Sequence, residues 1–161
     1  MRGAALAFSL FITLLLMFST ALISHAAGPF ALPHQIGTSI KYEVFSYGQS
    51  TGLHMKLVLK DKRPASFTAD GEIVDYEAPV FDLYSVYAGH ETLESSDVTY
   101  YVPTCYLYPT DAEFYDYLED YLELGGATVT RSGNILEWTK SAAGITTTVK
   151  IDMSYGVMTY L

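Results

Sequence analysis

The sequence is short of cysteine, with Cys105 the only one in 161 residues. A single cysteine cannot form a disulfide within its own chain, so the fold has to be held together by its packed core. Cys105 lies in the apolar stretch Tyr-Val-Pro-Thr-Cys-Tyr-Leu-Tyr, and we expect it to be a small buried core residue. A thiol nucleophile would need a neighbouring base that lowers its pKa, and the sequence indicates none.

Positive charge is missing from a large part of the chain, since no lysine or arginine occurs between Arg63 and Arg131. That interval holds most of the 18 acidic residues, and the chain carries a formal net charge of -9. Such an acidic surface repels nucleic acid and anionic lipid headgroups, which disfavours binding through a phosphate backbone over most of the surface, and we expect no nucleic-acid partner. A cation or a basic protein partner is compatible with this charge. So is the simpler interpretation that the acids keep an exported protein soluble.

Motifs of common catalytic sites are also lacking. The segment Gly48-Gln-Ser-Thr-Gly52 has the spacing of Gly-x-Ser-x-Gly, but it is expected in a hairpin turn and not in the strand-turn-helix context of a serine hydrolase. The other glycines are likewise scattered, mostly through expected turns. None of them forms a phosphate-binding loop ahead of a helix. We therefore expect no nucleotide site and no cofactor, and we favour a protein that is not an enzyme.

A long uncharged run follows Met1 and Arg2 and consists mostly of Ala, Leu, Phe and Ile. The small residues Ser24 and Ala26 fit a cleavage site, which predicts that residues 1–26 are a secretory signal peptide. An uncleaved N-terminal membrane anchor is the alternative, because about 20 apolar residues suffice to cross a bilayer as a helix. In both cases we expect the rest of the chain to be secreted or extracytoplasmic, in contact with the membrane only through this segment.

Alternating apolar and polar residues dominate the remainder and predict strands. We expect a linker over residues 27–37, rich in proline and glycine, and a single antiparallel β-rich domain over residues 38–161. Asp70 and Gly71 form the dipeptide preferred in tight hairpin turns. Further turns are expected at residues 48–52 and 61–64, a polar loop at residues 88–97, and a meander of strands after residue 127.

The stretch TDAEFYDYLEDYLELGG predicts a helix over residues 111–124. At about 100° per residue its apolar side chains fall on one side and most of its acids on the other. Thr110 and Glu113 fit a capping box, and Gly125 is placed to end the helix in a left-handed conformation. The acids have no lysine partners within the helix. We expect the tyrosines to pack on a sheet with their hydroxyls at the rim.

The nearest approach to a catalytic motif is His90-Glu91-Thr-Leu-Glu94. It looks like the zinc-protease helix signature with its second histidine replaced by glutamate, which removes a ligand. The signature also requires a helix, whereas this segment is expected to be a loop. With Asp97 nearby, the side chains of His90, Glu91, Glu94 and Asp97 form a candidate metal site. A solvated acidic loop is the other interpretation.

A sheet covered by one helix and rich in Tyr, Phe, Leu and Met can leave an apolar cleft for a lipid or another small apolar ligand. Trp138, the only tryptophan, could line such a cleft. The alternative is that the space is filled by the core.

Two segments carry a resemblance to a known group of proteins. They are Ile36-Gly-Thr-Ser-Ile-Lys-Tyr-Glu-Val, after the export segment, and Ile151-Asp-Met-Ser-Tyr-Gly-Val-Met-Thr-Tyr. Both look like the first and last strands of small exported archaeal β-sheet proteins of unknown function. The resemblance implies a strand-turn-strand ending and brings no catalytic residues with it.

We therefore expect an α+β fold, with a mainly antiparallel β-sheet of about eight strands in hairpins and a meander, and one amphipathic helix packed on a face. For function we expect a non-enzymatic binding or interaction domain whose partner is a protein, a cation or an apolar ligand. A carrier of a lipid or other apolar ligand and a metal-dependent hydrolase are the alternatives.

Overall fold

The structure, a computed structural model, describes residues 27–46 and 49–160. The expected signal peptide or membrane anchor over residues 1–26 lies outside the described residues. In the described part of the chain there is one helix, α2 (Ala112–Leu124). No helix in these residues is both long enough and apolar enough to span a membrane.

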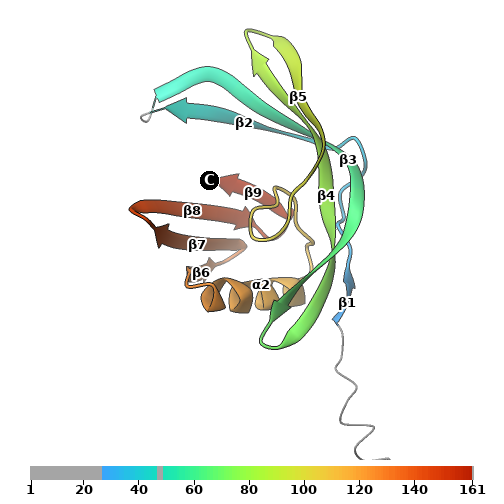
Figure 1. Ribbon diagram of the computed structural model, residues 1–161, viewed down its shortest axis with the longest axis vertical. Helices are drawn as coiled ribbons and strands as arrows, with labels where there is room; N and C mark the ends of the chain where they lie inside the picture. Colours follow the sequence, from blue (N-terminus) through green and yellow to red (C-terminus); the bar gives the residue numbers. More distant parts are fainter. Residues whose placement is uncertain (1–26, 47–48, 161) are drawn as a thin grey trace, which may run out of the picture.

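The other elements of the described chain are nine strands in two sheets (Figure 1). Sheet A has the order β1-β4-β3-β2, with β5 also pairing with β4, and sheet B has the order β6-β7-β8-β9. All pairs are antiparallel except β1 with β4. The fold is thus mostly β-sheet with one helix, as expected, although the strands form two sheets instead of one. The strands are β1 (Ala27–Phe30), β2 (Ser39–Ser46), β3 (Gln49–Ala69), β4 (Glu72–Tyr87), β5 (His90–Thr99), β6 (Thr128–Ser132), β7 (Ile135–Ala142), β8 (Ile145–Asp152) and β9 (Val157–Tyr160).

Strands β3 and β4 form one long hairpin that turns at Asp70 and Gly71, as predicted, with φ of 47° and 81°. The prediction of a turn at residues 61–64 is wrong, because β3 continues through this segment without interruption. Pro64 is tolerated there because β2 pairs only with the first part of β3, up to Val58. Beyond that point no described strand pairs with the outer edge of β3, so the missing N–H of proline leaves no ladder hydrogen bond unmade there.

The β3–β4 hairpin buries opposite faces in its two halves. Val74 and Tyr76 of β4 belong to the larger core cluster, whereas Phe81 belongs to the smaller one, and residues an odd number apart on a strand point to opposite sides. In β3 the ladder shifts by one residue between Leu59 and Asp61. This bulge places one extra residue in β3, so the strand stays paired as the hairpin changes its buried face.

Strand β5 replaces the polar loop expected at residues 88–97. Ala88 and Gly89, with φ of 49° and 83°, make a two-residue turn, and His90 then pairs with Tyr87. The segment did not look like a strand because its side chains are exposed on both faces at the edge of sheet A. Without a buried face there is no alternation of apolar and polar residues to detect.

The beginning of the expected linker over residues 27–37 belongs to the fold. Strand β1 pairs in parallel with β4, and Leu32 is 1% exposed in the smaller core cluster. The backbone N–H of Leu32 donates to Glu77 Oε2 at 2.8 Å, and Lys62 Nζ donates to the Leu32 carbonyl oxygen. These long-range contacts, which local composition does not reveal, hold the segment against the sheet.

Helix α2 has the expected span but different ends. Its N-cap is Asp111, without a side-chain capping bond, so the capping box built on Thr110 is wrong. Gly125 keeps a right-handed conformation with φ of -73°, and Gly126 takes the left-handed one with φ of 79°. The buried residues of α2 are Phe114, Tyr115, Leu118 and Leu122. The expected apolar side is only partly buried, because Leu124 is 72% exposed. The Tyr115 hydroxyl is buried and does not lie at the rim as expected.

The larger core cluster joins three parts of the molecule. The buried face of α2 meets the turn end of the β3–β4 hairpin, represented by Phe67 and Val74, and one face of sheet B, represented by Leu136 and Ile151. In Figure 1 the helix lies under sheet B, and the hairpin passes beside both. The smaller cluster, around Leu57 and Phe81, lies on the other half of the hairpin.

Candidate functional site

A groove lies between strands β2 and β3 of sheet A and strand β9, which is at the edge of sheet B. Its volume is about 570 Å³. A smaller hollow of about 220 Å³ shares Val44 and Met55 with it and continues toward Leu53 and Leu83. We call the larger hollow the inter-sheet groove; it is lined by Lys41, Tyr42, Glu43, Val44, Phe45, Met55, Tyr106 and Thr159.

Two hydroxyl groups in the inter-sheet groove are already paired within the protein. The Tyr42 hydroxyl donates to the Met158 carbonyl oxygen at 2.7 Å, and the Thr159 hydroxyl donates to the Lys150 carbonyl oxygen at 3.3 Å. The Tyr42 and Tyr106 rings lie 5.4 Å apart between centroids. Burial, and secondarily Tyr106, raises the pKa of Tyr42, so both rings present uncharged apolar surface at neutral pH. The groove is therefore suited to an apolar or amphipathic ligand.

A second hollow of about 390 Å³ lies where α2 ends beside sheet B. We call it the helix-end cleft; it is lined by Thr68, Pro103, Tyr121, Leu122, Leu124, Gly125, Ala127, Trp138 and Lys140. Trp138 is 4% exposed, and its indole Nε1 has no hydrogen-bond partner among the described residues. Lys140, two residues later on β7, is exposed and lies on the same side of sheet B. The sequence left two interpretations of Trp138 open, the lining of an apolar cleft and a packed core residue. The structure places its side chain in the larger core cluster, at the border of this cleft.

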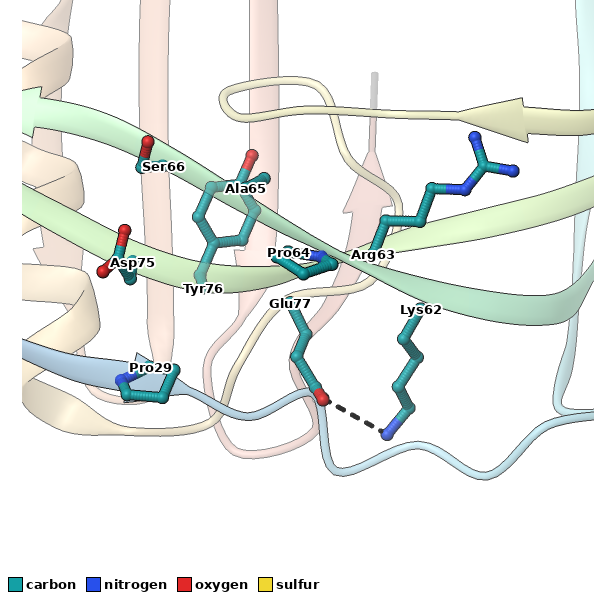
Figure 2. Close-up of a pocket in the computed structure, with 9 residues that line it drawn as sticks. All are labelled: Pro29, Lys62, Arg63, Pro64, Ala65, Ser66, Asp75, Tyr76 and Glu77. Atoms are coloured by element: carbon teal, nitrogen blue, oxygen red, sulfur yellow. Dashed lines mark ion pairs between the residues drawn. The ribbon is translucent and has the colours of Figure 1, made fainter.

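A third cleft, of about 460 Å³, lies on the outer side of the β3–β4 hairpin beside β1 (Figure 2). The Lys62 ammonium and the Glu77 carboxylate point toward one another at 3.5 Å, and Arg63 points away from them. Both members of this ion pair also bind the backbone of Leu32. This ion pair of the cleft therefore holds the segment that follows β1.

The candidate metal ligands lie on β5 and do not converge. Glu91 pairs with Lys56 at 2.9 Å, Asp97 pairs with Lys60 at 3.2 Å, and Glu94 accepts a hydrogen bond from Ser85. His90 is exposed at the start of the strand. In the described part of the chain no three His, Cys, Asp or Glu side chains are grouped to hold a metal ion.

Two acidic side chains of helix α2 form ion pairs with a basic residue of another element. Arg131 of β6 lies 3.0 Å from Asp116 Oδ1 and 2.7 Å from Glu119 Oε1. Near the end of the helix, Asp120 and Glu123 form a shallow acidic hollow together with Asp70 of the hairpin turn. An acidic surface of this kind attracts cations in general but has no geometry that selects one.

Cys105 is fully buried, as predicted, in the larger core cluster. Burial raises the pKa of its thiol, which keeps it protonated at neutral pH. The nearby phenol of Tyr108 donates to the Pro103 carbonyl oxygen at 2.9 Å. A thiol in this state is a packing group and not a nucleophile.

Comparison with protein-family models, with curated proteins and with solved structures found no match for this chain.

Proposed function

We propose that this protein is an exported or membrane-tethered, non-enzymatic binding domain that takes an extended, apolar segment of a partner protein into the inter-sheet groove. The observation that carries the proposal is the lining of the groove, where Tyr42, Met55 and Tyr106 offer apolar surface and the hydroxyls of Tyr42 and Thr159 are already paired. Aromatic and methionine side chains are typical of protein interaction surfaces. The apolar run of residues 1–26 supports export.

The edge of sheet A supports an extended partner. Strand β2 lines the groove and pairs only with β3 in the described part of the chain, so its outer backbone groups face no neighbouring strand. An extended peptide can add to such an edge through main-chain hydrogen bonds, while its alternate side chains enter a pocket. Phe45, 59% exposed on this strand, stands where such a partner would contact it.

Site-specific photo-crosslinking tests this proposal. The full chain carries p-benzoylphenylalanine in place of Phe45, at the groove, or in place of Tyr155, which is 70% exposed and does not line the groove. Each protein is irradiated in the extracellular fraction of the source organism, and the adducts are identified by mass spectrometry. We expect a protein adduct specific to position 45. The same adducts at both positions, or none at position 45, would contradict the proposal.

A carrier of an apolar ligand is the second candidate function, and the helix-end cleft favours it. The cleft combines Leu122, Leu124 and the ring of Trp138 in one hollow of about 390 Å³, within the size range of small-molecule sites. Native mass spectrometry of the protein from an exporting host, before and after denaturation, would detect a co-purifying lipid. A clean apo mass together with no binding of added apolar ligands would exclude this function.

A further inference from the structure

Strand β2 forms a regular edge of sheet A. It is the last strand in the order of its sheet, so its outer side faces no neighbouring strand in the described part of the chain. The β2–β3 ladder shifts between Glu43 and Phe45, but the extra residues belong to β3. Strand β2 itself continues without a bulge, and an unpaired edge of this kind is a template for a further strand.

The charged side chains of this edge have no ion-pair partner among the described residues. Lys41 and Glu43 are both exposed, and neither takes part in a salt bridge there. In the ladder Lys41 stands opposite Lys56, and like charges directly opposite one another are unfavourable. Glu43 accepts a hydrogen bond from the neutral Ser50 hydroxyl. The edge thus offers one cation and one anion, two residues apart on the same face of the strand.

An antiparallel pair of two β2 strands matches these charges. A two-fold axis at Tyr42 sets Lys41 of each copy opposite Glu43 of the other, and directly opposite residues point to the same face of a sheet. The same register sets Ile40 opposite Val44, both of them half-buried. Apolar side chains then meet on the face of the groove, and opposite charges meet on the other face. An axis at Lys41 or at Glu43 would instead set like charges against each other.

We infer that the extended segment which adds to the edge of the inter-sheet groove is β2 of a second copy of this chain, paired antiparallel about Tyr42. Main-chain hydrogen bonds along β2 and two ion pairs between Lys41 and Glu43 hold the dimer together. The two copies of sheet A become one continuous sheet, with both inter-sheet grooves on the same side. The inference rests on the proposed function of this groove, and it names the partner.

Exchanging the two charges tests the dimer. Analytical ultracentrifugation gives the dimer dissociation constant of the protein from an exporting host and of the variants Lys41→Glu and Glu43→Lys. Each variant sets like charges opposite one another twice, so each should weaken dimerisation at least about 10-fold. An equal mixture of the two variants should form heterodimers, because the acids of the first then stand opposite the lysines of the second. Lys140→Glu, exposed on β7, is the matched control and should leave the dissociation constant unchanged.

Three results would overturn the inference: an unmodified protein that stays monomeric, single variants that dimerise as well as the unmodified protein, or a mixture without heterodimers. The double variant Lys41→Glu/Glu43→Lys should regain the dimer, which shows that the single changes act through the pairing and not through the fold. Photo-crosslinking from position 45 separates the inference from the proposed function. An adduct with a second copy near Ser39 supports both, an adduct with a different protein removes only the inference, and no protein adduct contradicts both.

Discussion

Gly156 lies directly against the backbone of Tyr108. The Tyr108 N–H donates to the Gly156 carbonyl oxygen at 2.8 Å, and a β-carbon at Gly156 would collide with the Tyr108 carbonyl oxygen. Gly156 also has a positive φ of 59°. This contact joins the turn before β9 to the segment that leads into α2. A residue with no side chain is therefore required where the two segments meet.

Gly156→Ala should be strongly destabilising because it combines a left-handed backbone with a collision against main-chain atoms. Gly144→Ala is the matched control, since Gly144 has a φ of 80° but no atom near its missing β-carbon. We expect the control to lose about 1 kcal/mol of unfolding free energy and Gly156→Ala at least about 3 kcal/mol. Urea denaturation measures both, and equal losses would show that the contact with Tyr108 is unimportant.

Glu77→Ala should loosen the segment that follows β1. The change removes the acceptor of the Leu32 N–H and leaves Lys62 without its ion-pair partner. We expect a loss of about 1 to 2 kcal/mol and faster hydrogen exchange at the Leu32 amide. Glu91→Ala breaks an exposed ion pair with Lys56, and it should cost less than about 1 kcal/mol. If the Leu32 amide exchanges equally fast in both variants, the contacts of Glu77 and Lys62 with the Leu32 backbone do not hold that segment.

Two tyrosine hydroxyls should differ in what their removal costs. The Val102 N–H donates to the Tyr76 hydroxyl at 3.1 Å in the interior, where burial raises the pKa of Tyr76 to about 12. Tyr76→Phe leaves that buried N–H without an acceptor, which should cost about 1 to 3 kcal/mol. Tyr42→Phe frees only the Met158 carbonyl oxygen beside the open inter-sheet groove, where water can replace the phenol, and should cost about 0.5 to 1 kcal/mol. Thermal or urea unfolding of both variants gives the comparison, and a larger loss for Tyr42→Phe would contradict it.

His34 should make stability depend on pH. Burial lowers the pKa of its imidazole and the positive charge of Lys62 lowers it further, while the nearby backbone of Gly156 and Tyr155 opposes the shift. The folded protein therefore favours neutral His34, so the unfolded state binds more protons near pH 6. The stabilisation is complete above the unfolded pKa of about 6.5 and is lost as the pH falls through the lower folded value.

His34→Gln should flatten the unfolding free energy between about pH 7 and pH 5 relative to the unmodified protein. His90→Gln is the control, because His90 is exposed on β5, and its profile should run parallel to that of the unmodified protein. Urea denaturation at several pH values measures the three curves. Parallel curves for all three proteins would exclude His34 as the origin of the pH dependence.

The sequence by itself determined the features that depend on near neighbours. Alternation marked most strands, the positive φ available to Asp70 and Gly71 marked the long hairpin, and the helical period of 3.6 residues marked the buried face of α2. The buried state of Cys105 followed from its apolar surroundings. These signals are local, so they could be read before any tertiary contact was known.

Only the tertiary structure decided which distant residues meet. The bulge between Leu59 and Asp61 lets the hairpin contribute buried residues to two core clusters. The Lys62–Glu77 ion pair and its bonds to the Leu32 backbone hold residues of the expected linker against the sheet. The candidate ligands on β5 separate because strand geometry sends neighbouring side chains to opposite faces. The helix-end cleft exists because β7 brings Trp138 beside the end of α2. Register and long-range pairing set these distances, and no local pattern in the sequence encodes them.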